Sequence, residues 1–401
     1  MNYVIVGNGA AGTTAAELIK TKDPAGSVTL ITDEPYPLYN RVALPRFIKS
    51  LVPEDKVVMR SAAQHAKAGI DFLAETRVSK VSVQEHTLLL NTGKEFPWDR
   101  LLVATGGRPN RMKLAGGELP NVHNFQTLDE GKGIDQDLGR CRHGVSVGGS
   151  FISYELTEGF RHRGLETTWL IRGPRWLRRI LDEQGGALVD QIAKSHGVNV
   201  IYGEEVAEIR VKDGLAVGLV TTGGKSIDCD MIGVGLGLTM NIEFLADSGI
   251  ETHRGVLTDR CLRTNVPGVF AAGDIAEFED VVLGRHNMMG TWDNALAHGR
   301  VAGLNMVGAE EPYVDVPTYQ SGLFDTIISV LGMTPENHPE LESVASVDMA
   351  AHNYRKCFFL GNRLVGAVLI GSIRGKRKLM DMIKNGTPVA VSERQALLDA
   401  K

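Results

Sequence analysis

A glycine-rich turn near the start of the chain limits the possible folds most strongly. Residues 2–6 form an apolar run that predicts a buried strand, residues 10–20 predict a helix, and residues 28–31 predict the next strand. The turn Gly7-Asn8-Gly9-Ala10-Ala11-Gly12 lies between the first strand and the helix. In this context such a turn is typical of the first βαβ unit of a dinucleotide-binding α/β domain.

Each glycine of this turn has a separate role in such a domain. Gly7 permits the tight turn, Gly9 lets the backbone approach a pyrophosphate, and Gly12 allows the helix to pack closely on the strand. The helix N-terminus at Ala10 offers unpaired backbone N–H groups to the same phosphates. Asp33 ends the second strand, where its carboxylate can accept hydrogen bonds from an adenosine ribose. The turn and the acid together predict a bound dinucleotide.

The pattern repeats in the middle of the chain with different residues. Residues 145–147 predict a strand, Gly148-Gly149-Ser150-Phe151-Ile152-Ser153 a turn, a helix follows to about Arg163, and residues 167–171 predict the next strand. Serine stands where the second and third glycines are usual. We expect Ser150 to carry its side chain toward the pyrophosphate, where its hydroxyl can donate to phosphate, and Ser153 to push the helix slightly off the strand. A working second dinucleotide site is the preferred interpretation, and a degraded one is the alternative.

Composition excludes several function classes. A chain of 401 residues suggests two or three domains, and a formal net charge of −5 with a pI near 6.1 gives no basic field for nucleic acid. No apolar run reaches the ~18 residues that a membrane span needs, and no basic leader precedes the first strand, so we expect a cytoplasmic protein with no membrane partner. The four cysteines, Cys141, Cys229, Cys261 and Cys357, lie far apart and predict free thiols rather than a redox pair, and no metal site is indicated.

Five landmarks together resemble one family along nearly the whole chain. They are residues 7–12, Asp33, Leu102-Val103-Ala104-Thr105-Gly106, the unit 144–172, and Phe270-Ala271-Ala272-Gly273-Asp274. The set resembles the pyridine nucleotide-disulfide oxidoreductase superfamily of flavoproteins. This resemblance implies an α/β, glutathione-reductase-like fold with two Rossmann-like dinucleotide-binding domains and a small α+β C-terminal domain.

The resemblance also implies domain boundaries and flavin contacts. We expect residues 1–110 and 236–311 to form the FAD-binding domain, residues 111–235 the NAD(P)-binding domain, and residues 312–401 a C-terminal α+β interface domain. The residues implied to bind FAD are Gly7, Gly9, Ala10, Ala11, Gly12, Asp33, Glu34, Arg41, Arg46, Val78, Ala104, Thr105, Gly106, Gly273, Asp274 and Trp292.

Two further stretches, residues 34–41 and residues 290–302, resemble the branch that contains ferredoxin and rubredoxin reductases and the flavin part of nitrite reductase. In that branch the arginine matching Arg41 contacts FAD, and a lysine near the flavin is replaced here by Arg46. Residues 34–60 contain no cysteine, so electrons leave the flavin directly rather than through a thiol. The C-terminal segment resembles a cap that commonly forms a dimer face, which implies a homodimer. Within it we expect short strands at residues 357–360 and 364–370 and a terminal helix near residues 376–384.

The second dinucleotide unit is implied to bind NADH or NADPH as the electron donor. Phe151 matches an aromatic residue that lies over the flavin, and Glu155 matches an acid near the nicotinamide, so both are candidate catalytic residues together with Arg46. A core phenylalanine and a solvated helix glutamate are the alternatives. Arg172 and Arg178 favour NADPH because an arginine can pair with a 2′-phosphate, although a solvated basic loop with NADH is the alternative. The residues expected at this site are Gly148, Gly149, Ser150, Phe151, Arg172, Arg178 and Gly235.

The function that follows is an FAD-dependent NAD(P)H:acceptor oxidoreductase. Electrons pass from nicotinamide through flavin to rubredoxin, ferredoxin or another small iron–sulfur protein, or to a partner metalloenzyme. One alternative is the flavin subunit of a nitrite-reductase-like complex. Another is an FAD-binding interaction protein with little NAD(P)H turnover. The basic run at residues 374–378 is a candidate docking patch for an acidic acceptor, or merely a solvated helix start.

Overall fold

The computed structural model describes all residues except 281, 283, 337 and 400–401, and it divides the chain into two compact units. The first unit contains residues 1–40, 58–108 and 240–319. The second unit contains residues 41–57, 109–239 and 320–401. Residues 41–57 therefore group with the second unit rather than with the predicted FAD-binding segments. The three-part domain division remains our proposal for the functional boundaries.

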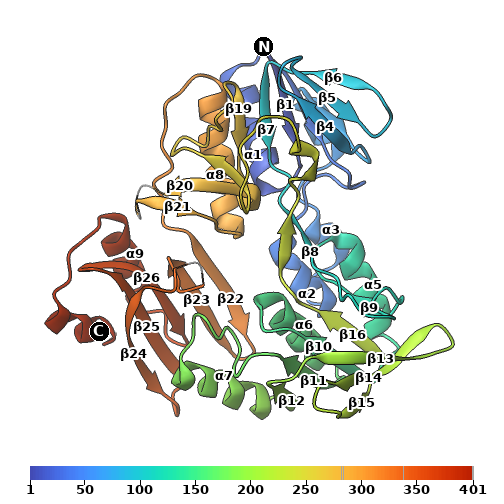
Figure 1. The fold of residues 1–401 in the computed structure, drawn as a ribbon, viewed down its shortest axis with the longest axis vertical. Helices are drawn as coiled ribbons and strands as arrows, with labels where there is room; N and C mark the ends of the chain where they lie inside the picture. The colour runs from blue at the N-terminus through green and yellow to red at the C-terminus, as the bar shows by residue number, and fades with distance from the viewer. Residues whose placement is uncertain (281, 283, 337, 400–401) are drawn as a thin grey trace. The chain divides into compact units, whose positions relative to one another are not determined.

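The first unit is built around a five-stranded parallel sheet in the order β19-β7-β1-β2-β3. Figure 1 shows β19, β7 and β1 side by side, and the apolar, β-branched residues of the sheet fill cores on both of its faces. The helices α1 and α8 pack against each other on one face. The bounds are β1 (Asn2–Val6), β2 (Ser27–Ile31), β3 (Ile70–Leu73), β7 (Arg100–Val103), β19 (Val269–Ala271), α1 (Ala10–Lys22) and α8 (Trp292–Met306). The predicted strand–turn–helix–strand start is confirmed.

Smaller elements complete the first unit. Two three-stranded sheets, β4-β5-β6 and β18-β20-β21, are formed by segments that alternate along the chain with strands of the parallel sheet. A short helix, α4, begins at a capping box formed by Ser61 and Gln64. The bounds are β4 (Val78–Ser82), β5 (Thr87–Leu90), β6 (Glu95–Pro97), β18 (Val256–Thr258), β20 (Ala276–Asp280), β21 (Arg285–Asn287), α4 (Ala62–Lys67), η2 (Glu243–Leu245) and η3 (Gly273–Ile275). The chain passes between the units through β8 (Gly107–Pro109), β17 (Leu238–Met240) and β22 (Thr318–Leu323).

The second unit repeats the parallel architecture in the order β12-β11-β10-β16-β9. The helix α6 packs on β10, β11 and β16, and the antiparallel sheet β13-β14-β15 follows β12. The bounds are β9 (Val122–His123), β10 (His143–Val147), β11 (Glu166–Ile171), β12 (Val198–Tyr202), β13 (Val206–Lys212), β14 (Leu215–Thr221), β15 (Ser226–Asp228), β16 (Met231–Val234), η1 (Arg41–Ala43), α2 (Leu44–Ile48), α3 (Glu54–Val57), α5 (Leu128–Leu138), α6 (Phe151–His162) and α7 (Glu183–Ser195). The second predicted strand–turn–helix–strand unit is confirmed.

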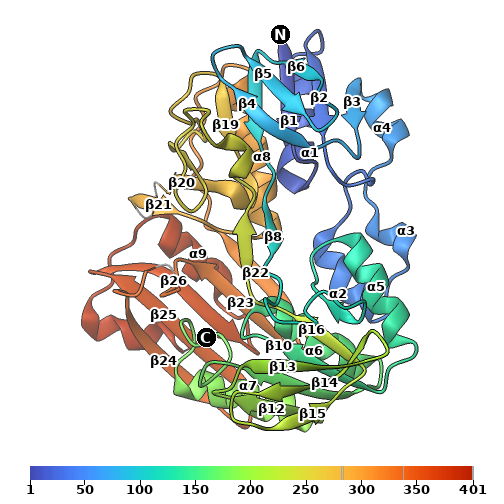
Figure 2. The ribbon, with the colours of Figure 1, turned by 45° about the vertical axis from the view of Figure 1, so that its right-hand side comes forward.

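The C-terminal part is an antiparallel sheet, β22-β23-β26-β25-β24, with the helix α9 packed on β26 (Figure 2). The predicted strands and terminal helix are present, although β25 begins earlier than the expected Cys357. The remaining bounds are β23 (Thr326–Gly332), β24 (Glu342–Asp348), β25 (Asn353–Leu360), β26 (Arg363–Ile370), α9 (Lys376–Lys384) and η4 (Val391–Leu397). Two parallel α/β sheets followed by this α+β part confirm the predicted fold class. Among the described residues, no helix is long and apolar enough to cross a bilayer.

Candidate functional site

The first glycine turn lies at the carboxyl edge of the sheet in the first unit, and its geometry explains its composition. Gly7 has φ +107°, and a Cβ there would lie 2.2 Å from the carbonyl oxygen of Ala104. A Cβ on Gly12 would lie 1.9 Å from the carbonyl oxygen of Gly7. Neither position therefore accepts a side chain. A Cβ on Gly9, in contrast, would meet no atom within 4 Å, so space is open above this residue.

The N-terminus of α1 opens toward that space without a competing side chain. Gly9 is the N-cap residue, no side chain caps the helix, and the first turn carries no acidic residue. The first backbone N–H groups of the helix are therefore available to a bound anion, and the macrodipole favours negative charge there. An open cradle over uncapped N–H groups fits the pyrophosphate of FAD.

The predicted ribose-binding acid is accessible at the same edge. Asp33 follows β2, and its side chain is 58% exposed in an ion pair with Arg77 at 3.3 Å. An exposed pair of this kind contributes little to stability, so the carboxylate can exchange its partner for ribose hydroxyls. Glu34 instead accepts a 2.6 Å hydrogen bond from the hydroxyl of Tyr39. Asp33 is therefore the better placed of the two acids for the ribose role.

The segment after β7 is held by an asparagine that the sequence did not single out. The hydroxyl of Thr105 donates to the backbone oxygen of Asn241 at 3.1 Å, and the side-chain amide of Asn241 donates to the oxygen of Thr105 at 3.0 Å. The backbone N–H of Asn241 also donates to the oxygen of Gly106, which has φ +56°. This reciprocal pairing fixes the predicted Ala104-Thr105-Gly106 segment beside the glycine turn.

The Gly-Asp turn after β19 returns to the same edge of the sheet. Gly273 has φ +80°, and a Cβ there would lie 3.1 Å from the Cβ of Ala11 at the start of α1. Gly290, which precedes α8, packs beside the carboxylate of Asp274. The predicted contact Trp292 is half-buried at the first position of α8. These predicted FAD-binding residues of the first unit thus gather around the N-terminus of α1.

A buried histidine stabilises the Gly273-Asp274 turn through a hydrogen bond. His298, on α8, accepts a hydrogen bond from the backbone N–H of Gly273 through Nδ1 at 3.3 Å. Its ring lies edge-on to Phe278 and Tyr313, with ring centroids 4.6 and 4.4 Å away. Complete burial lowers the pKa of His298 to about 3, so the ring is neutral and Nδ1 remains an acceptor. No pattern in the sequence distinguished this histidine from an ordinary core residue.

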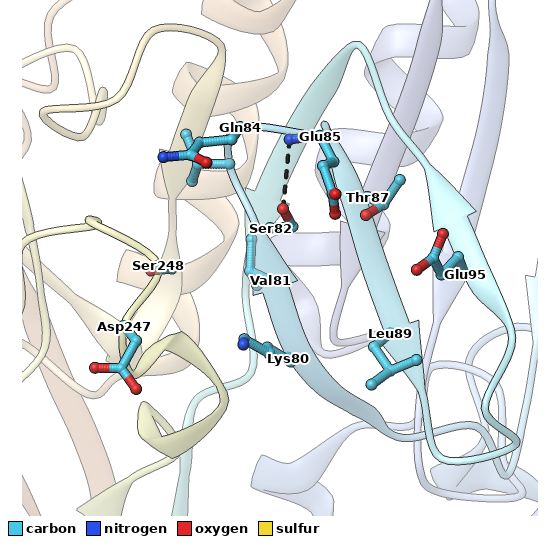
Figure 3. Close-up of a pocket in the computed structure, with 11 residues that line it drawn as sticks. Lys80, Val81, Ser82, Gln84, Glu85, Thr87, Leu89, Glu95, Asp247 and Ser248 are labelled. Carbon is cyan, nitrogen blue, oxygen red and sulfur yellow. Dashed lines mark hydrogen bonds between the residues drawn. The ribbon is translucent and has the colours of Figure 1, made fainter.

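Val78 does not line the surface groove on the hairpin to which it belongs. Val78 is buried at the start of β4 among the core residues that include Val6 and Ile31. A surface groove lies between the β4–β5 hairpin and the loop that holds Asp247 (Figure 3). It carries both signs of charge, from Lys80 and from Asp247 with two glutamates, and none of the predicted FAD-binding residues lines it. The groove is therefore distinct from the predicted flavin site.

The second turn achieves a similar close packing with different residues. Gly148 has φ +129°, and a Cβ there would lie 2.1 Å from the carbonyl oxygen of Gly235. A Cβ on Gly235 would lie 2.5 Å from the backbone nitrogen of Ser153. In the first unit the helix carries the glycine, Gly12, and the strand end carries Ala104. In the second unit the strand end carries the glycine, so Ser153 has room for its side chain.

Ser150 is engaged by the protein itself. Its hydroxyl donates to the carbonyl oxygen of Gly235 at 2.9 Å and accepts from the N–H of Ser153 at 3.4 Å as the N-cap of α6. Because its proton is directed to that carbonyl, the Ser150 hydroxyl must exchange this acceptor before it can donate to a phosphate, and the phosphate contact stays a prediction. One N–H of the helix start is occupied, in contrast to the uncapped start of α1.

The remaining candidates for the coenzyme site all belong to the second unit. The ring of Phe151 lies edge-on to Trp176 with ring centroids 5.4 Å apart, which places this phenylalanine in an aromatic cluster. Glu155 is half-buried on α6, one turn after Phe151. Arg172 is exposed in an ion pair with Glu205 at 3.1 Å, and Arg178 is exposed in the following turn. Their contacts with a coenzyme stay predictions.

Two arginines predicted to contact FAD also belong to the second unit. Arg41 donates to the backbone oxygen of Gln126 at 2.7 Å, which ties η1 to the start of α5. Arg46 is exposed on α2. The glycine turn and Asp274 belong to the first unit. The roles of Arg41 and Arg46 beside the flavin therefore remain predictions.

All four cysteines are free thiols, as predicted. Burial, with Asp137 and Asp230 nearby, raises the pKa of Cys141 to about 11, and burial raises the pKa of Cys229 and of Cys357 to about 12. Burial also raises the pKa of Cys261. Thiols with such pKa values carry almost no thiolate at neutral pH and make poor redox nucleophiles. In the described part of the chain, no group of three or more acids, histidines or cysteines is placed to hold a metal ion.

Comparison with known proteins adds independent findings. The profile of the pyridine nucleotide-disulphide oxidoreductase family matches residues 1–299, and the profile of the rubredoxin NAD+ reductase C-terminal domain matches residues 324–387. The chain is 27% identical over 377 residues to rhodocoxin reductase of Rhodococcus erythropolis, covering 93% of this chain and 87% of that protein. It is 23% identical over 402 residues to nitrite reductase [NAD(P)H] of Bacillus subtilis (strain 168), covering 98% of this chain but only 48% of that protein.

A solved structure gives the same fold. The covalent putidaredoxin reductase–putidaredoxin complex contains a chain that superposes with a TM-score of 0.92 at 21% identity, covering 99% of this chain and 95% of that chain. At this identity the similarity concerns the fold alone.

Proposed function

The chain belongs to the pyridine nucleotide-disulphide oxidoreductase family, and on that premise we propose that it carries electrons from a nicotinamide coenzyme, through bound FAD, to a small iron–sulfur protein or a partner redox enzyme. The chain is an FAD-dependent NAD(P)H oxidoreductase. We propose the electron acceptor, the coenzyme preference and the roles of individual residues as follows.

The observation that carries the proposal is the open, uncapped start of α1 within the family-matched region. Its N–H groups bind the pyrophosphate of FAD, Asp33 binds the ribose, and the Gly273-Asp274 turn closes the site from the other side. When bound, FAD supplies the redox chemistry by accepting a hydride and passing electrons on. The protein binds and orients it.

The second turn binds the donor coenzyme under this proposal. Gly148, Gly149 and Gly235 leave the backbone accessible, Phe151 and Glu155 orient the nicotinamide end, and Arg46 lies near the flavin. The arginines at 172 and 178 pair with a 2′-phosphate, which makes NADPH the preferred coenzyme.

A small acidic iron–sulfur protein is the proposed acceptor. The C-terminal match to the rubredoxin NAD+ reductase domain supports it, as does the basic run 374–378 at the start of α9. Arg374, Arg377 and Lys378 are exposed there. Cations at a helix N-terminus oppose the macrodipole and do not stabilise the helix, so a role in docking explains them better than a role in folding.

The proposal is tested by anaerobic stopped-flow mixing of the flavin-loaded protein with NADH and, separately, with NADPH. Bleaching of the flavin absorbance within seconds by either coenzyme supports reductase activity, and faster bleaching by NADPH supports the coenzyme assignment. Oxidised rubredoxin, a ferredoxin and a nitrite-reducing partner enzyme are then offered in turn to the reduced protein. Absence of bleaching by both coenzymes would leave an FAD-binding interaction protein as the better account.

The flavin subunit of a nitrite-reductase-like complex is the second candidate. The similarity to nitrite reductase extends over 98% of this chain but over about half of that protein, as expected if the remaining half were a separate chain. Reoxidation by the nitrite-reducing partner alone would favour this candidate.

We also propose that the chain forms a homodimer through its C-terminal sheet. Sedimentation equilibrium measures this oligomeric state directly.

A further inference from the structure

Three consecutive carbonyl groups of the second turn each accept a hydrogen bond from residues that follow it in the chain. The indole N–H of Trp169 donates to the oxygen of Gly148 at 3.0 Å. The backbone N–H of Leu177 donates to the oxygen of Gly149 at 3.3 Å. The indole N–H of Trp176 donates to the oxygen of Ser150 at 3.0 Å. The first three peptide carbonyls of the turn, at residues 148–150, are therefore all held from outside the turn.

The groups that make these bonds are buried and constrained. Both indoles are fully buried, and their rings lie 6.0 Å apart, each against the ring of Tyr154. Leu177 is buried with φ +45°, a backbone conformation that a leucine adopts only at a free-energy cost. A strained residue persists only where the surrounding contacts determine it. Here its N–H is directed to Gly149.

Among the described residues, the carbonyl groups of the first turn have no comparable arrangement. The oxygen of Asn8 accepts from the hydroxyl of Thr13 at 2.9 Å, and the oxygen of Gly9 accepts from the N–H of Thr13 at 3.0 Å. Both donors come from the helix that the turn itself begins. Gly7 and Asn8 do donate to segments beyond the helix, to the backbone oxygens of Ile31 and Tyr36. The difference therefore concerns the carbonyl groups: those of Asn8 and Gly9 accept from the turn's own helix, whereas those of the second turn accept from a strand and a turn beyond its helix.

The same outside segment presents charge to solvent. Residues 174–180 bury Trp176, Leu177 and Ile180 and expose Arg178 and Arg179. The hydrogen bonds from Trp176 and Leu177 consequently fix the position of these arginines relative to the glycine turn. The segment therefore joins the proposed pyrophosphate site and the proposed 2′-phosphate site into one rigid piece.

We propose that Trp169 and Trp176 are positioning residues of the coenzyme site, whose indole N–H groups hold the turn 148–150 in the shape that receives the coenzyme. This inference rests on the proposed function, since it assumes that the turn binds NAD(P)H. The indoles touch neither the reacting atoms nor the flavin in this account. They act through the backbone of the turn.

Replacing indole with phenyl separates the hydrogen bond from the packing. Trp176→Phe keeps an aromatic ring in the cluster but removes the donor. The oxygen of Ser150 still accepts from the hydroxyl of Ser153 at 2.8 Å and from the N–H of Tyr154 at 3.3 Å, so the variant leaves no buried acceptor unpaired and should fold. Trp169→Phe is the harsher variant because, within the described part of the chain, the Gly148 oxygen accepts from no donor but this indole.

Trp98→Phe is the matched control. Trp98 is 2% exposed and belongs to the first unit, and among the described residues its indole N–H has no hydrogen-bond partner. The control therefore applies the same chemical change to an equally buried tryptophan without removing a hydrogen bond. Flavin content, thermal midpoint, and the equilibrium Kd for oxidised NAD+ and NADP+ are measured for all variants. The KM for the reduced coenzyme and the limiting rate of flavin reduction are measured as well.

We expect Trp176→Phe to raise both Kd and KM about 3- to 10-fold, which corresponds to the loss of one net hydrogen bond, with the limiting reduction rate within about two-fold of the parent. Flavin content should not change. Trp169→Phe should raise Kd at least as much, and Trp98→Phe should leave it unchanged. The two positions should also be coupled in the double variant, because both act on one turn.

Two results would overturn the inference, and they are distinguishable. If the parent binds a coenzyme but Trp176→Phe and Trp169→Phe bind it as the Trp98→Phe control does, the indoles are packing residues only. If the parent binds neither coenzyme, the proposed function fails first, and the positioning role fails with it. A variant whose Kd is unchanged but whose thermal midpoint falls would likewise assign the indoles to stability alone.

Discussion

In both glycine turns of this protein a helix start packs closely on a strand end, but the glycine that permits this packing lies on the helix in one turn and on the strand end in the other. In the first, the helix carries the glycine, Gly12, and the helix start is uncapped. In the second, the strand end carries the glycine, Gly235, and Ser150 caps the helix. An uncapped start leaves every N–H for an anion, whereas a capped start offers one fewer. Under the proposed function, this difference would suit tight binding of FAD at the first turn and release of the coenzyme from the second.

The largest expected effect comes from exchanging the residues at the equivalent helix positions. Gly12→Ser introduces a Cβ 1.9 Å from the oxygen of Gly7, so the turn must open. We expect FAD affinity to fall on the order of 100-fold, which is about 2.7 kcal/mol. Ser153→Gly removes a side chain that the second turn already accommodates and should change coenzyme Kd by less than about three-fold. Flavin fluorescence titration measures the first, and equilibrium dialysis the second. Equal effects of the two changes would show that the turns are not packed differently.

Coenzyme preference provides the next largest effect. Arg172→Glu places a carboxylate beside Glu205 and removes a partner for a 2′-phosphate. A charge-assisted hydrogen bond contributes roughly 1.5 to 3 kcal/mol, so the ratio of kcat/KM with NADPH to that with NADH should fall about 10- to 150-fold. Arg111→Glu is the control, because Arg111 forms a similarly exposed ion pair with Glu118 elsewhere in the second unit. If the ratio does not move, Arg172 is surface charge.

How far the sequence could predict these turns depends on where their partners lie. Gly7, Gly9 and Gly12 were predictable because the turn, its strand and its helix are contiguous. Gly235 could be assigned to the coenzyme site only through the family resemblance, since its contact with Ser153 joins distant segments. His298 and Asn241 were missed because each acts through hydrogen bonds with a segment that is remote in the sequence.

The start of β25 was predicted too late for a related reason. Arg355 and Lys356 interrupt the apolar pattern, so the sequence suggested a strand only from Cys357. In the structure both are largely buried inside the strand. Arg355 donates to the backbone oxygen of Leu397, and Lys356 forms an ion pair with Asp182 at 3.7 Å. Charges with partners from other elements can occupy a buried strand, and no local pattern reveals those partners.

The buried, neutral His298 is expected to make the stability of the folded chain sensitive to acid. The unfolded chain protonates His298 near pH 6.5, but the folded chain does so only near pH 3, because burial lowers the pKa. Below pH 6.5 the unfolded state therefore binds more protons, and stability is lost as the pH falls toward 3. His298→Asn keeps an acceptor for Gly273 but does not titrate, so its stability should decline less over this range.

The corresponding experiment follows FAD release and tryptophan fluorescence from pH 7 to pH 3. His298→Leu removes the acceptor and should weaken FAD binding a few-fold even at pH 7, by about 1 kcal/mol. An acid response of His298→Asn identical to that of the parent would mean that other groups dominate acid unfolding.

The smallest expected effect concerns the proposed docking patch. Arg377→Glu with Lys378→Glu reverses two exposed charges at the start of α9. We expect the association rate with an acidic acceptor to fall roughly 3- to 10-fold at low salt, and its salt dependence to flatten. Stopped-flow reoxidation over a range of ionic strength measures both quantities. Bleaching by the coenzyme should be unaffected, and an unchanged salt dependence would move the docking site elsewhere.

The proposal that the first turn binds FAD and the second binds the coenzyme is tested most directly by flavin content per chain in two variants, one in each turn. Gly9→Val places a branched side chain in the open space over α1, where the pyrophosphate of FAD is to lie. Gly149→Val makes the same change at an exposed position of the second turn, where a Cβ meets only Ile171, at 3.4 Å. We predict that Gly9→Val purifies folded but colourless, and that Gly149→Val purifies yellow but is bleached by coenzyme at least about ten-fold more slowly than the parent. A yellow Gly9→Val, or a colourless Gly149→Val, would contradict the account.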